Sequence, residues 1–177
     1  MSPPDDRARR IIELLGLEPL PVEGGLYRQT WRLEADAPLP AGHVVGTAIY
    51  FALTDDPDSF SAMHRLRETE VWHFYTGDPV ELLLLLPDGE VERPVLGPDV
   101  LAGQRPQVVV HPGTWMGGAL APGGRFALLG TTMAPGFTPS SFETGIAEEL
   151  SAGWPSAAAT IERLTRPGAP LGMPDDT

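Results

Sequence analysis

The hydrophobic pattern of the chain is mainly that of short β-strands. Apolar and polar residues alternate with a period of two over residues 26–33, and a nearly unbroken apolar run rich in β-branched and aromatic residues follows at 44–53. The first pattern is typical of a half-buried strand, and the second of a central strand buried on both faces. Further extended runs at residues 80–86, 90–96 and 107–111 lie between turn-forming residues. These runs predict a domain built mostly from strands.

Turn signals predict two hairpins. Asp88-Gly89 separates two extended runs, and this dipeptide is a strong local signal for a tight β-turn. A Pro-Gly-Gly sequence at residues 122–124 separates the runs at 114–121 and 125–134 in the same way. We therefore expect each pair of runs to form antiparallel neighbours.

A helix is predicted near each end of the chain. Residues 5–16 are amphipathic and end at a glycine, and residues 156–166 lie between Pro155 and Pro167, as in a short helix with proline at both boundaries. Residues 167–177 contain no periodic apolar pattern, and we expect them to fray.

Length and composition indicate one domain. A chain of 177 residues fits a single core, so the prediction is one domain over 1–177 with its barrel at about residues 26–134. The 20 glycines and 20 prolines are spread between the apolar runs as turn formers. An all-β domain with about nine strands is a sandwich, a jelly roll or a closed barrel, and the strand count does not choose among them.

Charge and composition exclude several classes of function. The 24 acidic and 12 basic residues give a formal net charge of -12, which would repel the phosphate backbone of a nucleic acid. The absence of cysteine excludes disulfides, thiolate metal sites and a cysteine nucleophile. No apolar run has the length of a membrane span or a signal peptide, so no membrane partner and a cytoplasmic location are expected.

Candidate chemistry is concentrated in residues 61–77, SAMHRLRETEVWHFYTG. If residues 69–76 form one strand, Glu70 points to the same side as Trp72, while His73 points to the other. His64 and Glu70 therefore remain as one candidate pair.

The spacing of this stretch resembles the first motif of the cupins. His64, Glu70 and Gly77 occupy motif positions, whereas Leu66 occupies the position of a second histidine ligand. The VVVHPGTWM sequence at 108–116 resembles the second motif, with a methionine where a third histidine ligand would lie.

Longer blocks extend the resemblance over about residues 10–165. The chain is similar to the cupin subfamily long catalogued as a domain of unknown function (DUF985) in five blocks, namely GGLYRQTW, TAIYFAL, HRLRETEVWHFYTGDPVEL, GQRPQVVVHPGTW and APGFTPSSFE. The resemblance implies a double-stranded β-helix, that is, a jelly-roll barrel with an internal pocket, usually as a homodimer. It also implies a fold similar to that of the rhamnose-pathway sugar-nucleotide epimerases, without prescribing a reaction.

His64 and Glu70 are the candidate catalytic residues, as an acid and base that exchange a proton with a ligand. The alternatives are an incomplete metal site or a hydrogen-bonded pair that only fixes the local structure. A divalent metal would have two protein ligands where three are usual, and the thioether of Met116 is a poor ligand for the metals that cupins use. The cofactor is therefore none or unknown, with a metal at His64 and Glu70 as the alternative.

Candidate ligand contacts surround this pair. Arg28 could hold an anionic group, aromatic side chains could form a wall, and glutamines could donate hydrogen bonds from the barrel mouth. The full set is Arg28, Tyr50, Trp72, Phe74, Gln104, Gln107, Trp115 and Met116. The alternative for the aromatic residues is the hydrophobic core, and for Arg28 a surface ion pair. His43, His73 and His111 are expected at the surface or in structural roles.

Three hypotheses of function follow. The first is a small-molecule-binding cupin with isomerase or epimerase chemistry on a sugar-like or carboxylated ligand. The second is a non-catalytic binding or interaction barrel filled by its own side chains, which is suggested by Leu66 and Met116 at ligand positions. The third is a metal-dependent oxygenase or isomerase with an unusual ligand set.

Overall fold

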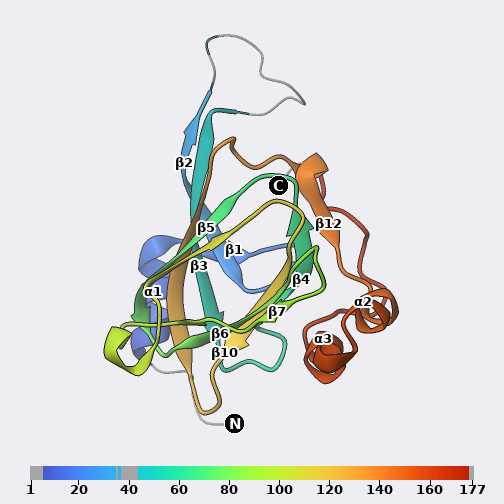
Figure 1. Ribbon diagram of the computed structural model, residues 1–177. Helices are drawn as coiled ribbons and strands as arrows, with labels where there is room; N and C mark the ends of the chain where they lie inside the picture. The colour runs from blue at the N-terminus through green and yellow to red at the C-terminus, as the bar shows by residue number, and fades with distance from the viewer. Residues whose placement is uncertain (1–5, 35, 37–43, 176–177) are drawn as a thin grey trace.

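Two antiparallel β-sheets face each other in the computed structural model, which describes residues 6–34, 36 and 44–175 (Figure 1). The first sheet has the strand order β1-β2-β3-β11-β5-β9, and the second has the order β12-β4-β10-β6-β7, with β8 paired to β6. This is the all-β jelly roll that was predicted. The strands are β1 (Glu18–Pro19), β2 (Leu26–Leu33), β3 (Gly46–Thr54), β4 (Ser61–Leu66), β5 (Glu70–Gly77), β6 (Val80–Leu85), β7 (Val91–Glu92), β8 (Val95–Leu96), β9 (Gln107–Val110), β10 (Trp115–Leu120), β11 (Phe126–Met133) and β12 (Phe142–Thr144).

The hydrophobic core lies between the two sheets. Phe51 and Trp72 of the first sheet meet edge to face at 5.5 Å between ring centroids, and both are almost fully buried. Leu82 and Met116 pack against them from the second sheet. Burial of each such side chain contributes about 1.5–3 kcal/mol, so this layer is a main source of stability.

Helices cover the outer faces of both sheets (Figure 1). Helix α1 (Asp6–Leu15) buries Ala8 against the first sheet, where it meets Ala52. Helices α2 (Ala147–Gly153) and α3 (Ala158–Arg163) pack against the second sheet. The two predicted helices are thus present, the second as the 3-10 turn Pro155–Ala157 continued by α3, and α2 is an additional helix.

One predicted hairpin is present and the other is absent. β6 and β7 pair across Asp88-Gly89, with Leu85 opposite Val91. The expected pairing of residues 114–121 with 125–134 was wrong, because β10 pairs with β4 and β6 while β11 pairs with β3 and β5. The turn at 122–124 therefore carries the chain from one sheet to the other, an arrangement that a turn signal does not distinguish from a hairpin.

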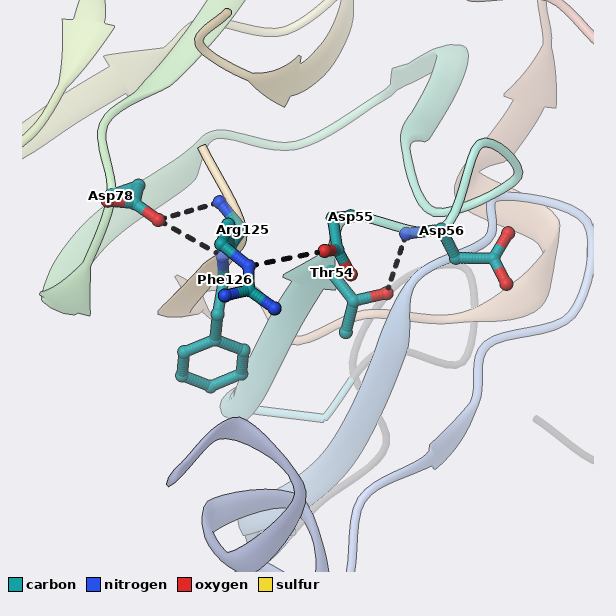
Figure 2. A network of polar contacts seen from close by, with 6 residues as sticks. All are labelled: Thr54, Asp55, Asp56, Asp78, Arg125 and Phe126. Atoms are coloured by element: carbon teal, nitrogen blue, oxygen red, sulfur yellow. Dashed lines mark hydrogen bonds and ion pairs between the residues drawn. The ribbon is translucent and has the colours of Figure 1, made fainter. Parts of the chain in front are cut away.

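A polar network fastens this crossing turn at one end of the barrel (Figure 2). Asp78 Oδ2 accepts hydrogen bonds from the backbone N–H groups of Arg125 at 2.7 Å and Phe126 at 3.2 Å. Arg125 Nε donates to Asp55 Oδ2 at 3.5 Å, and the Asp56 N–H donates to Thr54 Oγ1 at 3.4 Å. These contacts fix the crossing turn to the ends of β3 and β5.

The segment after α3 is packed rather than frayed. Thr144 Oγ1 donates to the Pro170 carbonyl at 2.6 Å, and the Thr144 N–H donates to the Leu171 carbonyl at 3.1 Å. Met173 is only 8% exposed and belongs to the core between the sheets. The expectation of a frayed tail is therefore corrected for residues 170–173, because this segment covers the edge of β12. No helix in the described ranges has the length and apolarity needed to cross a membrane.

Candidate functional site

A cavity of about 60 Å³ lies between the sheets at the end opposite the polar network. This volume holds roughly four to six water molecules, so the matching ligand is compact. The lining consists of Leu20, Glu23, Tyr27, Gln29, Thr47, Ala48, Ile49, His64, Leu66, Glu70, Thr131, Met133, Phe137, Phe142 and Met173.

His64 and Glu70 reach this cavity from opposite sheets. β4 ends at Leu66 in the second sheet, and β5 begins at Glu70 in the first sheet. The short turn between them crosses the barrel, so the two side chains meet across the interior with exposed fractions of 2% and 6%. The alternation of side chains along β5 predicted that Glu70 points into the barrel. Because the chain crosses between the sheets after β4, His64 faces Glu70 from the opposite sheet.

Glu23 is a third ionisable residue of the cavity, and sequence reasoning missed it. Its side chain is largely buried, and its Oε1 accepts a hydrogen bond of 2.7 Å from Ser61 Oγ. Its Oε2 lies 3.9 Å from His64 Nε2. A single glutamate before Gly24-Gly25 resembles an exposed turn residue, and only the tertiary structure places it beside His64.

A strained turn directs Glu23 into the cavity. The Glu23 N–H donates to the Pro21 carbonyl at 2.6 Å, and Val22 between them has φ +64°. A three-residue turn with positive φ at its centre is rare and strained, and a β-branched residue is an outlier there. Such strain persists where the surrounding structure imposes it, often at functional sites.

Burial dominates the protonation of the two carboxyl groups. It raises the pKa of Glu23 to about 7, against the opposing hydrogen bond from Ser61 and the charge of Arg166. It likewise raises the pKa of Glu70 to about 7. The nearby Glu23 adds to this rise, whereas His64 and the side chains of Thr131 and Trp72 oppose it. Both carboxyl groups therefore exchange protons near neutral pH, as a general acid or base requires.

His64 is held as a neutral imidazole with a defined tautomer. Burial lowers its pKa, against the opposing effects of Glu70 and the Ala62 carbonyl. Its Nδ1 lies 2.7 Å from the Ala62 carbonyl oxygen, which can only accept, so Nδ1 carries the proton. Nε2 is left with a free lone pair, and the ring stacks on Phe142 at 4.9 Å between centroids.

Two polar atoms of the site await a partner. The distance of 3.9 Å from His64 Nε2 to Glu23 Oε2 is too long for a hydrogen bond. Glu70 Oε2 is buried and has no hydrogen-bond partner of good geometry in the described part of the chain, although the side chains of Thr131 and Trp72 lie close enough to lower the pKa of this carboxyl group. Buried polar atoms are normally paired, so both positions favour a bound polar group.

The donor set does not fit the metal site of a cupin. Across residues 6–34, 36 and 44–175, no group of three or more His, Asp or Glu side chains has the arrangement needed to hold a metal ion. Leu66 lines the cavity and Met116 lies in the core, where motif histidines would be expected. At these motif positions only His64 and Glu70 remain as donors, fewer than a cupin metal site needs.

Arg28, Gln107 and Tyr50 lie away from the cavity. Arg28 Nη1 donates to the Leu15 carbonyl at 3.4 Å on the outer face of the first sheet, whereas its neighbours in β2 line the cavity. Gln107 Nε2 lies 3.4 Å from His73 Nδ1 on the outer face, and Tyr50 packs near α1. The strand alternation places them outside, because adjacent side chains point to opposite faces.

The other candidate contacts belong to the core or to loops. Trp72 and Phe74 face the interior as parity predicted, but they pack in the core beyond the cavity lining. Trp115 faces the C-terminal helices, with the Arg65 guanidinium 4.6 Å from its ring. Gln104 Oε1 accepts from the Asp99 N–H in a surface loop.

The remaining histidines lie outside the site. His73 contacts Thr132 Oγ1 at 3.1 Å on the outer face of the first sheet. His111 is exposed at the turn before β10. His43, which was expected at the surface, lies outside the described residues.

The family model described as "Cupin superfamily (DUF985)" matches residues 9–145, well over half of the chain. This chain belongs to the cupin superfamily. The resemblance of the sequence blocks is thereby confirmed. A search of curated proteins gave no match to this cupin.

Solved structures agree with this assignment. A Shewanella oneidensis protein is 38% identical to this cupin with a TM-score of 0.81, over 90% of this chain and 98% of the other. A hypothetical protein from Leishmania major is 28% identical with a TM-score of 0.80, over 89% and 98% of the two chains. A dTDP sugar isomerase from Desulfovibrio desulfuricans is 21% identical with a TM-score of 0.52, over 88% and 90%, which shows a shared fold alone.

Proposed function

We propose that this cupin binds a small molecule between Glu23, His64 and Glu70 and transfers a proton on it, as an isomerase or epimerase does. The observation that carries the proposal is the pair of polar atoms without partners, His64 Nε2 and Glu70 Oε2, in one buried cavity. A neutral imidazole can take a proton, and a carboxyl group with a pKa of about 7 can donate one at the same pH.

The proposed step uses these groups in complementary states. His64 Nε2 removes a proton from a carbon next to a carbonyl group, and the protonated Glu70 gives its proton to the carbonyl oxygen. The resulting enol is neutral and the imidazole becomes charged beside the Glu70 carboxylate, so charge balances inside the barrel. His64, or a protonated Glu23 that His64 then reprotonates, delivers a proton to carbon. The enol O–H returns its proton to the Glu70 carboxylate at the same time, which restores the carbonyl group and completes an isomerisation.

Isotope exchange tests the proposal directly. The protein in D2O is incubated with compact hydroxyketones and aminoketones, which suit a cavity of about 60 Å³, and NMR follows the loss of the carbon-bound proton. We expect exchange for at least one compound, with a reduction of about 100-fold or more in His64→Gln and Glu70→Gln.

The matched control is His73→Gln, which removes the same side chain from the outer face. It should leave the exchange rate unchanged. Exchange that survives in His64→Gln and Glu70→Gln, or its absence for every compound in the wild-type protein, would contradict the catalytic proposal.

A non-catalytic binding barrel is the second candidate. The small cavity and the apolar Leu66 in its lining favour it. Both limit the size and polarity of the ligand, and neither supplies a group that could act as an acid, a base or a metal ligand. Stabilisation of the protein by a compound that shows no isotope exchange would support this alternative.

We also propose a homodimer formed through the outer face of the first sheet. Trp31 in β2, Tyr75 in β5 and Val109 in β9 are 44%, 49% and 45% exposed there and would supply apolar contacts to a second copy. Light scattering after size exclusion tests the mass of the wild-type protein and of Tyr75→Glu, which should be monomeric.

A further inference from the structure

The cavity has acidic groups and no cationic side chain. The sequence has no lysine, and its twelve basic residues are arginines that all lie within the described ranges. None of them lines the cavity, whose ionisable side chains include Glu23, His64 and Glu70. An anionic ligand would meet two carboxyl groups without a counter-ion, which is unfavourable in a buried site.

The cation that acts on Glu23 is engaged elsewhere. Arg166 Nη2 donates to the Asp58 carbonyl at 2.7 Å and to the Phe60 carbonyl at 3.3 Å. Its guanidinium also lies 3.9 Å from the centroid of the Phe60 ring. It therefore lowers the pKa of Glu23 from behind the cavity wall and does not reach a ligand.

We propose that the ligand of this cavity is a compact primary ammonium compound, whose N–H groups donate to Glu23, Glu70 and His64 Nε2. The inference rests on the proposed function of this cavity as a binding site, and it names the class of ligand. A primary ammonium group carries three donors, which matches the two atoms without partners and the nearby Glu23 Oε2. An alcohol has one donor and no charge, and a quaternary ammonium has charge and no donor.

The rest of the cavity fits the body of such a molecule. Phe137, Phe142 and Tyr27 offer aromatic surfaces, which attract an ammonium group or its adjacent methylene groups. Leu20, Ile49, Leu66, Met133 and Met173 supply apolar contacts. With a cavity of about 60 Å³, the expected body is a chain of a few carbon atoms, which in a substrate of the proposed step includes the carbonyl group.

Binding should release protons. Burial holds the pKa of both Glu23 and Glu70 at about 7, so a substantial fraction of each is protonated at pH 6.5. An ammonium group beside them stabilises the carboxylates and displaces those protons. The Ser61, Thr131 and Trp72 side chains and the Ala62 carbonyl also face these groups, and none of them ionises in this range.

Titration calorimetry with three probes of similar size tests the proposal on the full-length protein. The probes are n-propylammonium, 1-propanol and propionate, measured at pH 6.5 in two buffers with different ionisation enthalpies. We expect n-propylammonium to bind at least tenfold more tightly than either other probe, with release of protons to the buffer. Glu70→Gln and Glu23→Gln should each weaken that binding about tenfold or more, whereas His73→Gln should not.

The outcomes separate the two proposals. If 1-propanol or propionate binds as tightly as n-propylammonium and the binding is lost in Glu70→Gln, the ammonium class is overturned while the cavity stands as a binding site. If n-propylammonium binds without proton release and equally well to Glu70→Gln and Glu23→Gln, it lies elsewhere and the proposal fails. If no probe binds at millimolar concentration, the ammonium proposal also fails, and the isotope-exchange test decides the proposed function independently. The comparison of the three probes uses the wild-type protein alone. Its result is therefore valid even if Glu70→Gln or Glu23→Gln fails to fold.

Discussion

His64 Nε2 lies 3.9 Å from Glu23 Oε2, although 40 residues separate the loop before β2 from the middle of β4 and both side chains are largely buried. The gap is too wide for a direct hydrogen bond, and Glu70 faces the same space from the other sheet. A neutral base and two carboxyl groups that titrate near neutral pH thus surround one small cavity.

The first prediction concerns stability and pH. The folded pKa of Glu70 is about 7, above its ordinary value of 4.5, so its protonated form favours the folded state. The stabilisation is complete below about pH 4.5 and is lost as pH rises through 7, by on the order of 3 kcal/mol. Urea unfolding from pH 4.5 to 8 should therefore show a steeper decline in the wild-type protein than in Glu70→Gln.

His64 acts in the opposite sense and does not obscure this comparison. Its lowered pKa gives stability that is present above its ordinary value of 6.5 and is lost as pH falls. It is present in both proteins, so their difference isolates Glu70 together with its coupling to its neighbours. The exposed Glu92→Gln is the control, and an identical pH dependence of Glu70→Gln and wild type would contradict the buried titration.

The second prediction tests the glycine that closes the first cupin motif. Gly77 has φ +108°, and a Cβ there would overlap the Phe126 carbonyl oxygen. Gly77→Ala should lower the free energy of unfolding by about 3 kcal/mol, through backbone strain together with the clash. Gly89→Ala is the matched control, because Gly89 has φ +95° with no atom within 4 Å of its Cβ position, and about 1 kcal/mol is expected. Equal losses would show that the contact with Phe126 is unimportant.

The third prediction concerns the C-terminal segment over the cavity. Thr144→Val removes the hydrogen bond to the Pro170 carbonyl and should cost about 1 kcal/mol. Hydrogen exchange should become faster at the Thr144 amide, which donates to the Leu171 carbonyl. Thr144→Ser keeps the hydroxyl group and should retain the protection. Unchanged exchange in Thr144→Val would mean that this bond does not hold the segment.

The fourth prediction concerns metal content. Because Leu66 and Met116 stand at two of the cupin ligand positions, we expect less than about a tenth of a metal ion per chain in protein purified without chelator, since a genuine site retains its ion. Elemental analysis provides the measurement. About one metal per chain, lost on His64→Gln, would overturn our reading of the donor set.

Local sequence signals predicted much of the fold. The alternation of side chains around Glu70 correctly predicted that this residue points into the barrel. Asp88-Gly89 correctly predicted the hairpin between β6 and β7. The same type of signal failed at residues 122–124, since a tight turn joins either paired strands or strands of opposite sheets. The choice depends on contacts between residues distant in sequence.

The candidate site was only partly predictable for the same reason. Arg28 was predicted to contact the ligand, but it lies on the outer face of β2. The sequence showed that Arg28 and Tyr27 point to opposite faces. It did not show which face is inside, because both faces of this strand carry aromatic or polar residues. Glu23 gave no local signal of burial at all.

By itself, the sequence determined the cupin family and the strand-rich architecture, and it singled out His64 and Glu70 as one candidate pair, because motif spacing and side-chain alternation are local properties. Only the tertiary structure decided that Glu23 joins them, that no arginine enters the cavity and that the C-terminal segment covers the edge of β12. These features arise where the two sheets meet the loop that carries Glu23 and the C-terminal segment. Contacts between such distant parts of the chain determine how deeply the ionisable side chains are buried and therefore their protonation.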